Sequence, residues 1–289
     1  GGFVGYLQLG FNLQLDNTLA GSAPQSNAVV YASSTGNGNV GGIIGYQYPI
    51  TYSYSTATMS DVTITSPNIY SPGQYVGGSI GNSSYSSSAT LTRNNIQGVS
   101  IGSSGSTVST NYVGGLVGFG SYITVNNSNV NSTSSVKATT NYVGGLIGEA
   151  NSSTVSYSSS NAPITTSASS SSYVGGLVGY ANSSATIANS WSNSTITTLN
   201  TSSYTGGYLG GLVGSMGNSG QTLGGSILNS YFEGSIATGA NATNFGGLSG
   251  YMVPGTWISN SFYNIDSSLI GGNKVVSPGG IFASQYTAW

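Results

Sequence analysis

The sequence predicts an all-β protein built as a parallel β-solenoid, in which short coils of chain stack on one another. Three observations support this fold class. A block of the form Tyr-Val-Gly-Gly-Leu-Val-Gly returns every 30 to 40 residues, apolar residues recur in step with it, and charged residues make up only 3% of the chain. One such unit cannot bury its apolar face alone, whereas stacked units bury it against their neighbours.

The paired glycines of this block mark the repeat. They begin at Gly1, Gly41, Gly77, Gly114, Gly144, Gly175, Gly210 and Gly246. The clearest copies of the block start at Tyr112, Tyr142 and Tyr173. The first residues match the back half of the block, so we expect the chain to start inside a repeat.

Each unit also holds a second block and a third apolar segment. The second block reads Ile187-Ala188-Asn189-Ser190-Trp191, and it returns at 227–231 and 258–262. The third segment is represented by Ser194 to Thr198. These segments are rich in Val, Ile, Thr and Tyr, as strands are, and runs of Ser, Asn and Gly between them predict turns. No segment has a sustained 3.6-residue apolar period.

The count of segments predicts about eight turns of three short strands each. A β-propeller is the alternative, because its blades have a similar length, but a blade needs four strands. We expect one repeat domain over residues 1–289, with a degenerate N-terminal turn at 1–40, repeats at 41–261 and a C-terminal cap at 262–289. Two stretches, 51–71 and 204–208, are expected to leave the stack as surface loops.

Residues at equal motif positions should form columns along the solenoid. An inward apolar column is expected from Leu116, Leu146, Leu177, Leu212 and Leu248. An amide column at a corner is expected from Asn189, Asn229 and Asn260. The tyrosines Tyr112, Tyr142 and Tyr173 favour a partly buried structural column, with an exposed stripe as the alternative. Trp191, Tyr231 and Phe262 are expected in the core.

The repeated block resembles the GLUG motif, which is named for its Gly-Leu-any-Gly core. That core stands at 115–118, 145–148, 176–179, 211–214 and 247–250. The Asn-Ser-aromatic continuation and the segment from 262 to 289 are also similar to this family. GLUG repeats occur in secreted and surface-anchored proteins, including adhesins. The resemblance implies a β-helix-like fold and an extracellular or cell-surface location, and it implies no catalytic residues.

The ionisable side chains do not predict an active site. They are Asp16, Asp61, Arg93, Lys137, Glu149, Glu233, Asp266 and Lys274, and the chain has no His or Cys. No two carboxylates share a motif position, and Glu149 and Glu233 should point to different faces. We therefore expect no catalytic residues, no metal site, no cofactor and stability that is nearly independent of pH. The net charge of −2 gives no basic surface for nucleic acid, and no apolar stretch is long enough to span a membrane.

Glycosylation is the specific chemistry that the sequence favours. Asn-x-Ser/Thr triplets occur at Asn82, Asn126, Asn131, Asn151, Asn182, Asn193, Asn200 and Asn241. A chain this rich in Asn, Ser and Thr produces some of them by chance. Attached glycans would supply the surface hydration that charged residues do not supply.

These observations predict a structural extracellular or cell-surface protein, a filament, sheath or adhesin-stalk subunit that self-associates. A low charge permits close packing of copies, because no like-charge repulsion opposes it. The first alternative is an adhesin module that binds surface glycans through exposed aromatic residues. The second is a polysaccharide-active β-helix enzyme.

Overall fold

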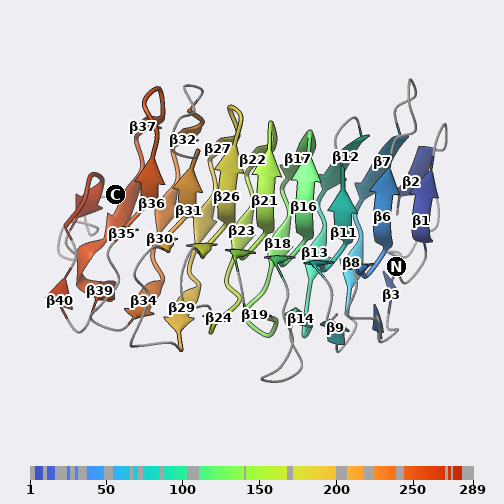
Figure 1. Ribbon diagram of the computed structural model, residues 1–289, viewed down its shortest axis with the longest axis horizontal. Helices are drawn as coiled ribbons and strands as arrows, with labels where there is room; N and C mark the ends of the chain where they lie inside the picture. The colour runs from blue at the N-terminus through green and yellow to red at the C-terminus, as the bar shows by residue number, and fades with distance from the viewer. Residues whose placement is uncertain are drawn as a thin grey trace.

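The computed structural model describes residues 4–8, 12–16, 25–26, 30–31, 38–48, 55–65, 68–70, 74–84, 87–102, 111–139, 141–167, 172–199, 207–217, 224–238, 244–270, 273–274 and 276–281. In these residues the chain winds into stacked coils, and five sheets run along the long axis (Figure 1). The predicted parallel β-solenoid is confirmed. A β-propeller is wrong, because the strands pair with strands one coil away rather than with their neighbours in the chain, apart from β39 and β40 at the C-terminal end.

Two of the five sheets form adjoining walls of the solenoid. Sheet A holds eight strands: β1 (Val4–Gln8), β6 (Ile44–Tyr48), β11 (Ile80–Ser83), β16 (Val117–Ser121), β21 (Ile147–Asn151), β26 (Val178–Asn182), β31 (Val213–Met216) and β36 (Ser249–Met252). Sheet B holds eight strands: β2 (Asn12–Asp16), β7 (Ser55–Ser60), β12 (Ser87–Thr92), β17 (Ile123–Asn126), β22 (Thr154–Ser156), β27 (Thr186–Ala188), β32 (Ser226–Leu228) and β37 (Trp257–Ser259).

The next two sheets continue around the coil. Sheet C holds nine strands: β3 (Gln25–Ser26), β8 (Thr63–Ile64), β13 (Asn95–Ile96), β18 (Asn129–Val130), β23 (Ser159–Ser160), β28 (Trp191–Ser192), β33 (Tyr231–Phe232), β38 (Phe262–Asn264) and β41 (Gly280–Ile281). Sheet D holds nine strands: β4 (Val30–Tyr31), β9 (Asn68–Tyr70), β14 (Ser100–Gly102), β19 (Ser135–Ala138), β24 (Ile164–Thr166), β29 (Thr195–Thr198), β34 (Ser235–Thr238), β39 (Ser268–Ile270) and β40 (Asn273–Lys274).

Sheet E completes the coil and carries the first half of the repeated block. Its seven strands are β5 (Asn39–Gly41), β10 (Tyr75–Gly77), β15 (Tyr112–Gly114), β20 (Tyr142–Gly144), β25 (Tyr173–Gly175), β30 (Tyr208–Gly210) and β35 (Asn244–Gly246). All the pairs are parallel except that of β39 with β40. The described residues contain no α-helix, and they include one 3-10 turn at Ile265–Ser267.

The expected three strands per turn are wrong, because each complete coil has five, in the order E, A, B, C and D. Six such coils, β5 to β34, lie between a first coil of four strands (β1–β4) and a last coil that begins at β35. The repeated block contains two strands rather than one, because its second glycine and its leucine form a turn between sheets E and A. The Asn-Ser-aromatic block likewise divides at a corner, between sheets B and C.

The stretch 51–71 does not leave the stack as a loop. Its described residues form β7, β8 and β9, which pair in register with the same three strands of the next coil. The irregular spacing of the repeat misled the sequence interpretation here. Of the second stretch, 204–208, only residues 207 and 208 are described, and Tyr208 begins β30.

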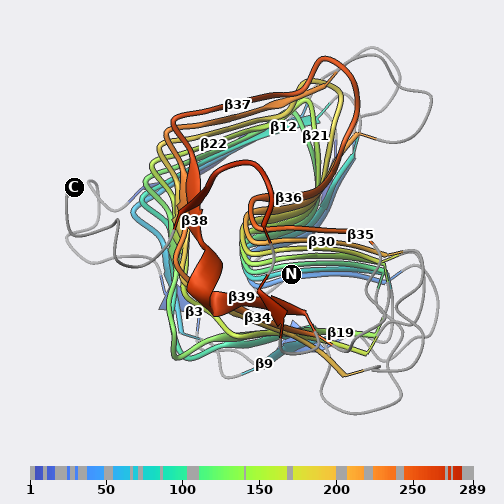
Figure 2. The same cartoon turned by 90° about the vertical axis from the view of Figure 1, so that its left-hand side faces the viewer.

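The turn between sheets E and A points into the solenoid. Seen down the long axis, the strands of sheet E run from the outside toward the middle, and those of sheet A run outward again (Figure 2). The backbones of the two sheets touch where they meet. A Cβ on Gly148 of sheet A would lie 2.8 Å from the nitrogen of Val113 in sheet E. In the turn itself successive coils are equally close, since a Cβ on Gly115 would lie 2.0 Å from the carbonyl oxygen of Gly145 in the next coil. Only glycine permits this approach.

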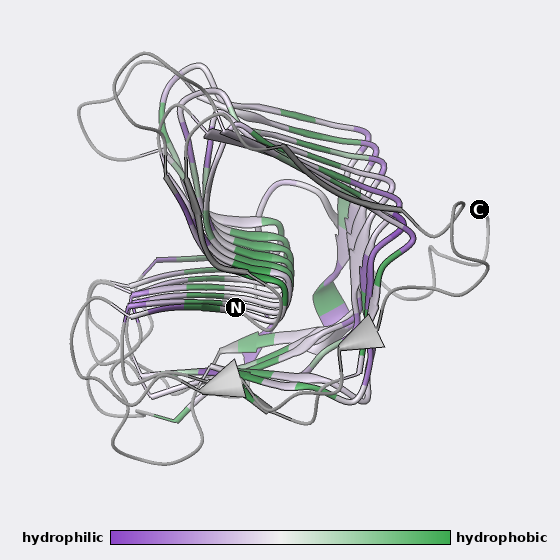
Figure 3. Ribbon diagram, turned by 90° about the vertical axis from the view of Figure 1, so that its right-hand side faces the viewer, coloured by the Kyte–Doolittle hydropathy of each residue, from purple (hydrophilic) through white to green (hydrophobic). Residues whose placement is uncertain are grey.

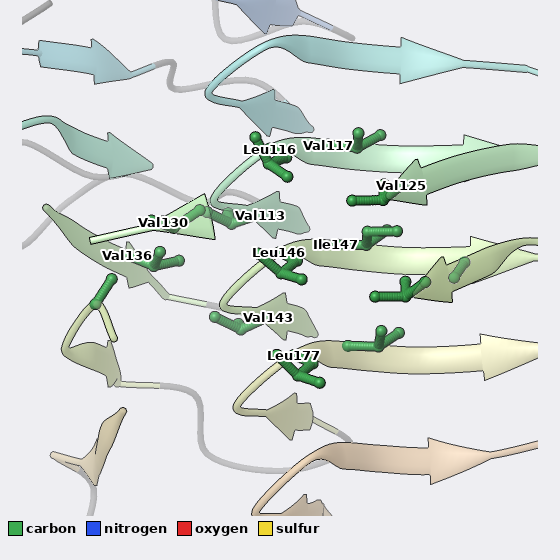
Figure 4. Packing of buried hydrophobic residues seen from close by; sticks show 14 of the residues in the cluster. Val113, Leu116, Val117, Val125, Val130, Val136, Val143, Leu146, Ile147 and Leu177 are labelled. Carbon is green, nitrogen blue, oxygen red and sulfur yellow. The ribbon is translucent and has the colours of Figure 1, made fainter. Parts of the chain in front are cut away.

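The predicted leucine column lies at the tip of this turn and is fully buried. Leu116, Leu146 and Leu177 stack on one another in the middle of the solenoid (Figure 4). The hydropathy colouring shows the same apolar band at the inward turn (Figure 3). Backbone hydrogen bonds of 2.8 Å, from the nitrogen of Leu116 to the oxygen of Leu146 and from Leu146 to Leu177, hold the leucines in register. The inward turn thus supplies the core that a wide coil of short strands could not fill.

Candidate interaction surface

The outward angle between sheets E and A is filled by aromatic rings. On sheet E, Tyr75, Tyr112, Tyr142, Tyr173 and Tyr208 form a continuous tyrosine ladder along the axis. Their ring centroids are 4.6, 4.7, 5.0 and 5.1 Å apart, and each pair is stacked. All five side chains are partly buried, which confirms the interpretation as a structural column. Offset stacking at this distance contributes stability beyond area burial.

A second column, from sheet A, packs against the tyrosine ladder. Phe119 meets Tyr75 and Tyr112 edge-on at 6.0 and 5.8 Å. Tyr180 meets Tyr142 and Tyr173 at 5.6 and 5.1 Å. We call the tyrosine ladder and this sheet A column together the aromatic seam. The backbones of sheets E and A touch at glycines, and the two sheets diverge from that contact. The aromatic rings fill the space between them.

A carboxyl group lies inside the aromatic seam. Glu149 occupies the sheet A position between Phe119 and Tyr180 in register, and only 7% of its surface is exposed. It makes no hydrogen bond to a described residue. Burial therefore raises the pKa of Glu149 to about 7. Burial, together with the charge of Glu149, raises the pKa of Tyr142 to about 12. The expectation of pH-independent stability is wrong at this residue.

The corner between sheets B and C is built from two columns, one exposed and one buried. The exposed column has left-handed backbone angles, with φ of 49°, 48° and 46° at Asn189, Asn229 and Asn260. The Nδ2 of Asn229 donates to Asn189 Oδ1 at 3.3 Å, and the Nδ2 of Asn260 donates to Asn229 Oδ1 at 3.2 Å. The predicted amide column is therefore confirmed.

The buried column of the corner is made of serine, which the sequence analysis missed. The backbone N–H of Ser158 donates to Ser190 Oγ at 3.2 Å, and that of Ser190 donates to Ser230 Oγ at 3.1 Å. The Oγ of Ser190 in turn donates to the carbonyl oxygen of Ala188 at 2.7 Å. These serines satisfy the backbone groups that the turn would leave unpaired inside the protein. The signal was visible, because serine precedes the aromatic residue in each copy of the second block.

The aromatic residues of the second block point outward, so their expected place in the core is wrong. Tyr231 is 36% exposed and Trp191 is partly buried. The indole of Trp191 stacks on Tyr231 with centroids 5.8 Å apart and planes within 3°, and Phe262 follows in register. We call Trp191, Tyr231 and Phe262 the outer aromatic column. The next residue of each strand points inward instead, as fully buried Phe232 and Tyr263 do.

The charged side chains do not gather in one place. Arg93 Nε lies 2.6 Å from Asp61 Oδ1 in an exposed pair that lowers the pKa of Asp61, and Lys274 pairs with Asp266. Glu149 lies in the seam, whereas Glu233 is exposed beside sheet C, so the two glutamates do point to different faces. In the described ranges no group of three or more His, Cys, Asp or Glu is placed to hold a metal ion. The described residues include no helix with the length and apolarity to cross a bilayer.

The candidate glycosylation sites fall into three groups by exposure. Asn193 is exposed, and Asn126, Asn131 and Asn182 are partly buried. Asn82 and Asn151 are buried in sheet A, with 7% and 8% of their surface exposed. Asn200 and Asn241 lie outside the described residues. Exposure therefore favours Asn193 as a site that a glycosylating enzyme could reach in the folded chain.

Comparison with known proteins gives no match to a family model, to a curated protein or to a solved structure.

Proposed function

We propose that this chain is a structural repeat protein of the GLUG type, located outside the cell or on its surface, that self-associates as a filament, sheath or adhesin-stalk component. The Gly-Leu-any-Gly cores support the first part, because the last glycine of each core lies where sheets E and A touch, and the first lies against its equivalent in the next coil. The reachable glycosylation triplet at Asn193 supports the location.

One observation carries the proposal of self-association: the outer face of sheet B is regular, and it has no charged residue in the four successive strands β7, β12, β17 and β22. Thr58, Thr90, Thr124 and Thr154 pair in register and are exposed. Their hydroxyls make no hydrogen bond to a described residue, so they remain able to bond with a second copy. Strands repeat at about 4.8 Å, and two such faces can align without like-charge repulsion.

Sedimentation velocity over a range of concentrations, followed by electron microscopy, tests this proposal. We expect regular assemblies that change little with ionic strength, because few charges are present to be screened. The double variant Thr124→Lys, Thr154→Lys should dissociate them at low salt. The control, Thr165→Lys with Thr197→Lys, adds the same charge to sheet D, where Lys137 already stands in register. Monomers at every concentration would contradict the proposal.

A second candidate function is binding of surface glycans. The outward orientation of Trp191 and Tyr231 favours it, because exposed aromatic clusters on monomers commonly mark interaction sites. The polysaccharide-active enzyme stays a lesser alternative, because Glu149 lies on sheet A and Glu233 lies beside sheet C, so the two glutamates do not form a carboxylate pair.

A further inference from the structure

We propose that sheet C carries a binding site for one unit of a neutral glycan, at the step where the outer aromatic column begins. The inference rests on the second candidate function above and gives it a location, a donor set and a charge preference. The site comprises Tyr157, Ser159, Asn189, Trp191 and Tyr231.

At one end of the site, the aromatic residue Trp191 lies next to a small residue of the preceding coil, Ser159. Trp191 pairs in register with Ser159 of the preceding coil. On its other side Trp191 stacks on Tyr231. One face of the indole is therefore stacked by Tyr231, whereas the residue in register on the side of the preceding coil is Ser159, which has no ring. Within the described residues Trp191 has no other ring contact.

The stack itself is more open than the tyrosine ladder. Stacked rings in the ladder have centroids 4.6 to 5.1 Å apart, whereas those of Trp191 and Tyr231 lie 5.8 Å apart with planes within 3°. At this distance the rings are offset sideways, because rings in contact are separated by less than that along their normal. Part of each ring face therefore stays uncovered. The apolar C–H face of a pyranose ring fits such an aromatic surface.

The amide column also ends at this step and leaves donors unpaired. Asn189 accepts from Asn229, but the next position along the corner is Tyr157, which has no amide. The Nδ2 of Asn189 and the Nε1 of Trp191 donate to no described residue. Tyr157 is 61% exposed, and its side chain has no ring contact or hydrogen bond to a described residue. Two unpaired donors beside an open aromatic face match a ligand that has hydroxyl acceptors on an apolar ring.

The charges around the site favour a neutral glycan over an acidic one. Burial, together with the charge of the exposed Glu233, raises the pKa of Tyr231, so a negative charge acts on the outer aromatic column. The described cations do not offset it, since Arg93 pairs with Asp61, Lys274 pairs with Asp266, and Lys137 lies on sheet D. A carboxylated or sulfated polysaccharide would therefore be repelled.

Affinity electrophoresis through gels that contain hydroxyethyl cellulose, galactomannan, yeast mannan or alginate tests the proposal. The full chain is produced in a host without N-glycosylation, so that Asn193, two residues from Trp191, stays unmodified. We expect at least one of the three neutral polymers, and not the acidic alginate, to slow the protein. Trp191→Ala should weaken binding about tenfold or more, since each tenfold corresponds to about 1.4 kcal/mol and one aromatic stack supplies about that. Trp191→Phe keeps an aromatic ring but loses the Nε1 donor, so its affinity should lie between that of the unchanged protein and that of Trp191→Ala.

Trp257→Ala is the matched control, because Trp257 is 73% exposed and lies on sheet B. It should bind as the unchanged protein does. Circular dichroism melting checks that each variant is folded. The proposal is overturned if none of the neutral polymers slows the protein, if alginate slows it more, or if Trp191→Ala binds as well as Trp257→Ala. Sedimentation of the same samples reports self-association separately, so failure of glycan binding and failure of the structural role are distinguishable.

Discussion

The aromatic seam and the outer aromatic column use the same residue types with opposite results. In the seam, Tyr142 stacks on rings at 4.7 and 5.0 Å and is backed by Tyr180. In the outer column, Trp191 has one stacking partner at 5.8 Å and an open second face. The difference arises from the glycine turn, because it folds sheet A against sheet E and gives the tyrosines a second wall. Aromatic repetition along a solenoid therefore serves stability where two sheets meet, and it leaves surface free for binding where one sheet faces solvent.

The largest effect is expected from separating the two walls of the seam. In Gly148→Ala, the new Cβ would lie 2.5 Å from the oxygen of Gly118 and 2.8 Å from the nitrogen of Val113. Both are backbone atoms of stacked strands, so neither can move alone. We expect a loss of more than about 4 kcal/mol in the free energy of unfolding, measured by urea denaturation. Thr124→Ala on the outside of sheet B is the control, and equal losses in the two variants would contradict this account.

The second effect concerns the carboxyl group inside the seam. The pKa of Glu149 is about 7 in the folded chain, against 4.5 for an unperturbed glutamate side chain. Between these values the folded chain holds a proton that the unfolded chain has released, so stability falls as the pH rises from 4.5 to 7. The fall should be about 3 kcal/mol and should level off above pH 7. Glu149→Gln should abolish it and be the more stable protein at pH 8. Parallel stability–pH curves for the two proteins over this window would refute the assignment.

The third effect is the loss of one ring from the aromatic seam, to be compared with the loss of one ring from the outer aromatic column. Tyr142→Ala removes two stacked contacts and one tilted contact from the seam. We expect it to destabilise the protein by about 2 to 3 kcal/mol, because a partly buried ring and its stacking are lost. Tyr142→Phe should retain most of the stability. Thermal or urea unfolding followed by circular dichroism measures the difference.

The smallest effect is expected in the outer aromatic column. Trp191→Ala removes one offset stack from an outward position, so its cost should be below about 1 kcal/mol. The unfolding measurement used for Tyr142→Ala applies here. A loss as large as that of Tyr142→Ala would mean that the outer column is structural, and that its surface is not free to bind a ligand.

Part of this architecture could be predicted from the sequence because it follows from residue identity at repeated positions. Leu116 and its equivalents are apolar in each clear copy, so they had to face the core. Asn189, Asn229 and Asn260 stand at matching turn positions, so their amides had to meet. Sheet C was missed because β23 consists of Ser159 and Ser160, which resemble a loop in an Asn- and Ser-rich chain. The orientation of Trp191 could not be predicted for the same reason. Its strand, β28, has only two residues, and two residues do not define an inward–outward alternation.

The sequence alone determined that the chain repeats, that the repeats stack as parallel strands, and which residues share a column, because identical motif positions in stacked coils must coincide. Only the tertiary structure decided that the glycine block turns inward. That turn depends on the contact between the backbones of sheets E and A, and no side-chain pattern records it. It also decided the placement of Glu149, whose pKa is raised by burial between stacked coils. The outward orientation of Trp191 was settled in the same way, because the corner serines fix which residue of each short strand enters the core.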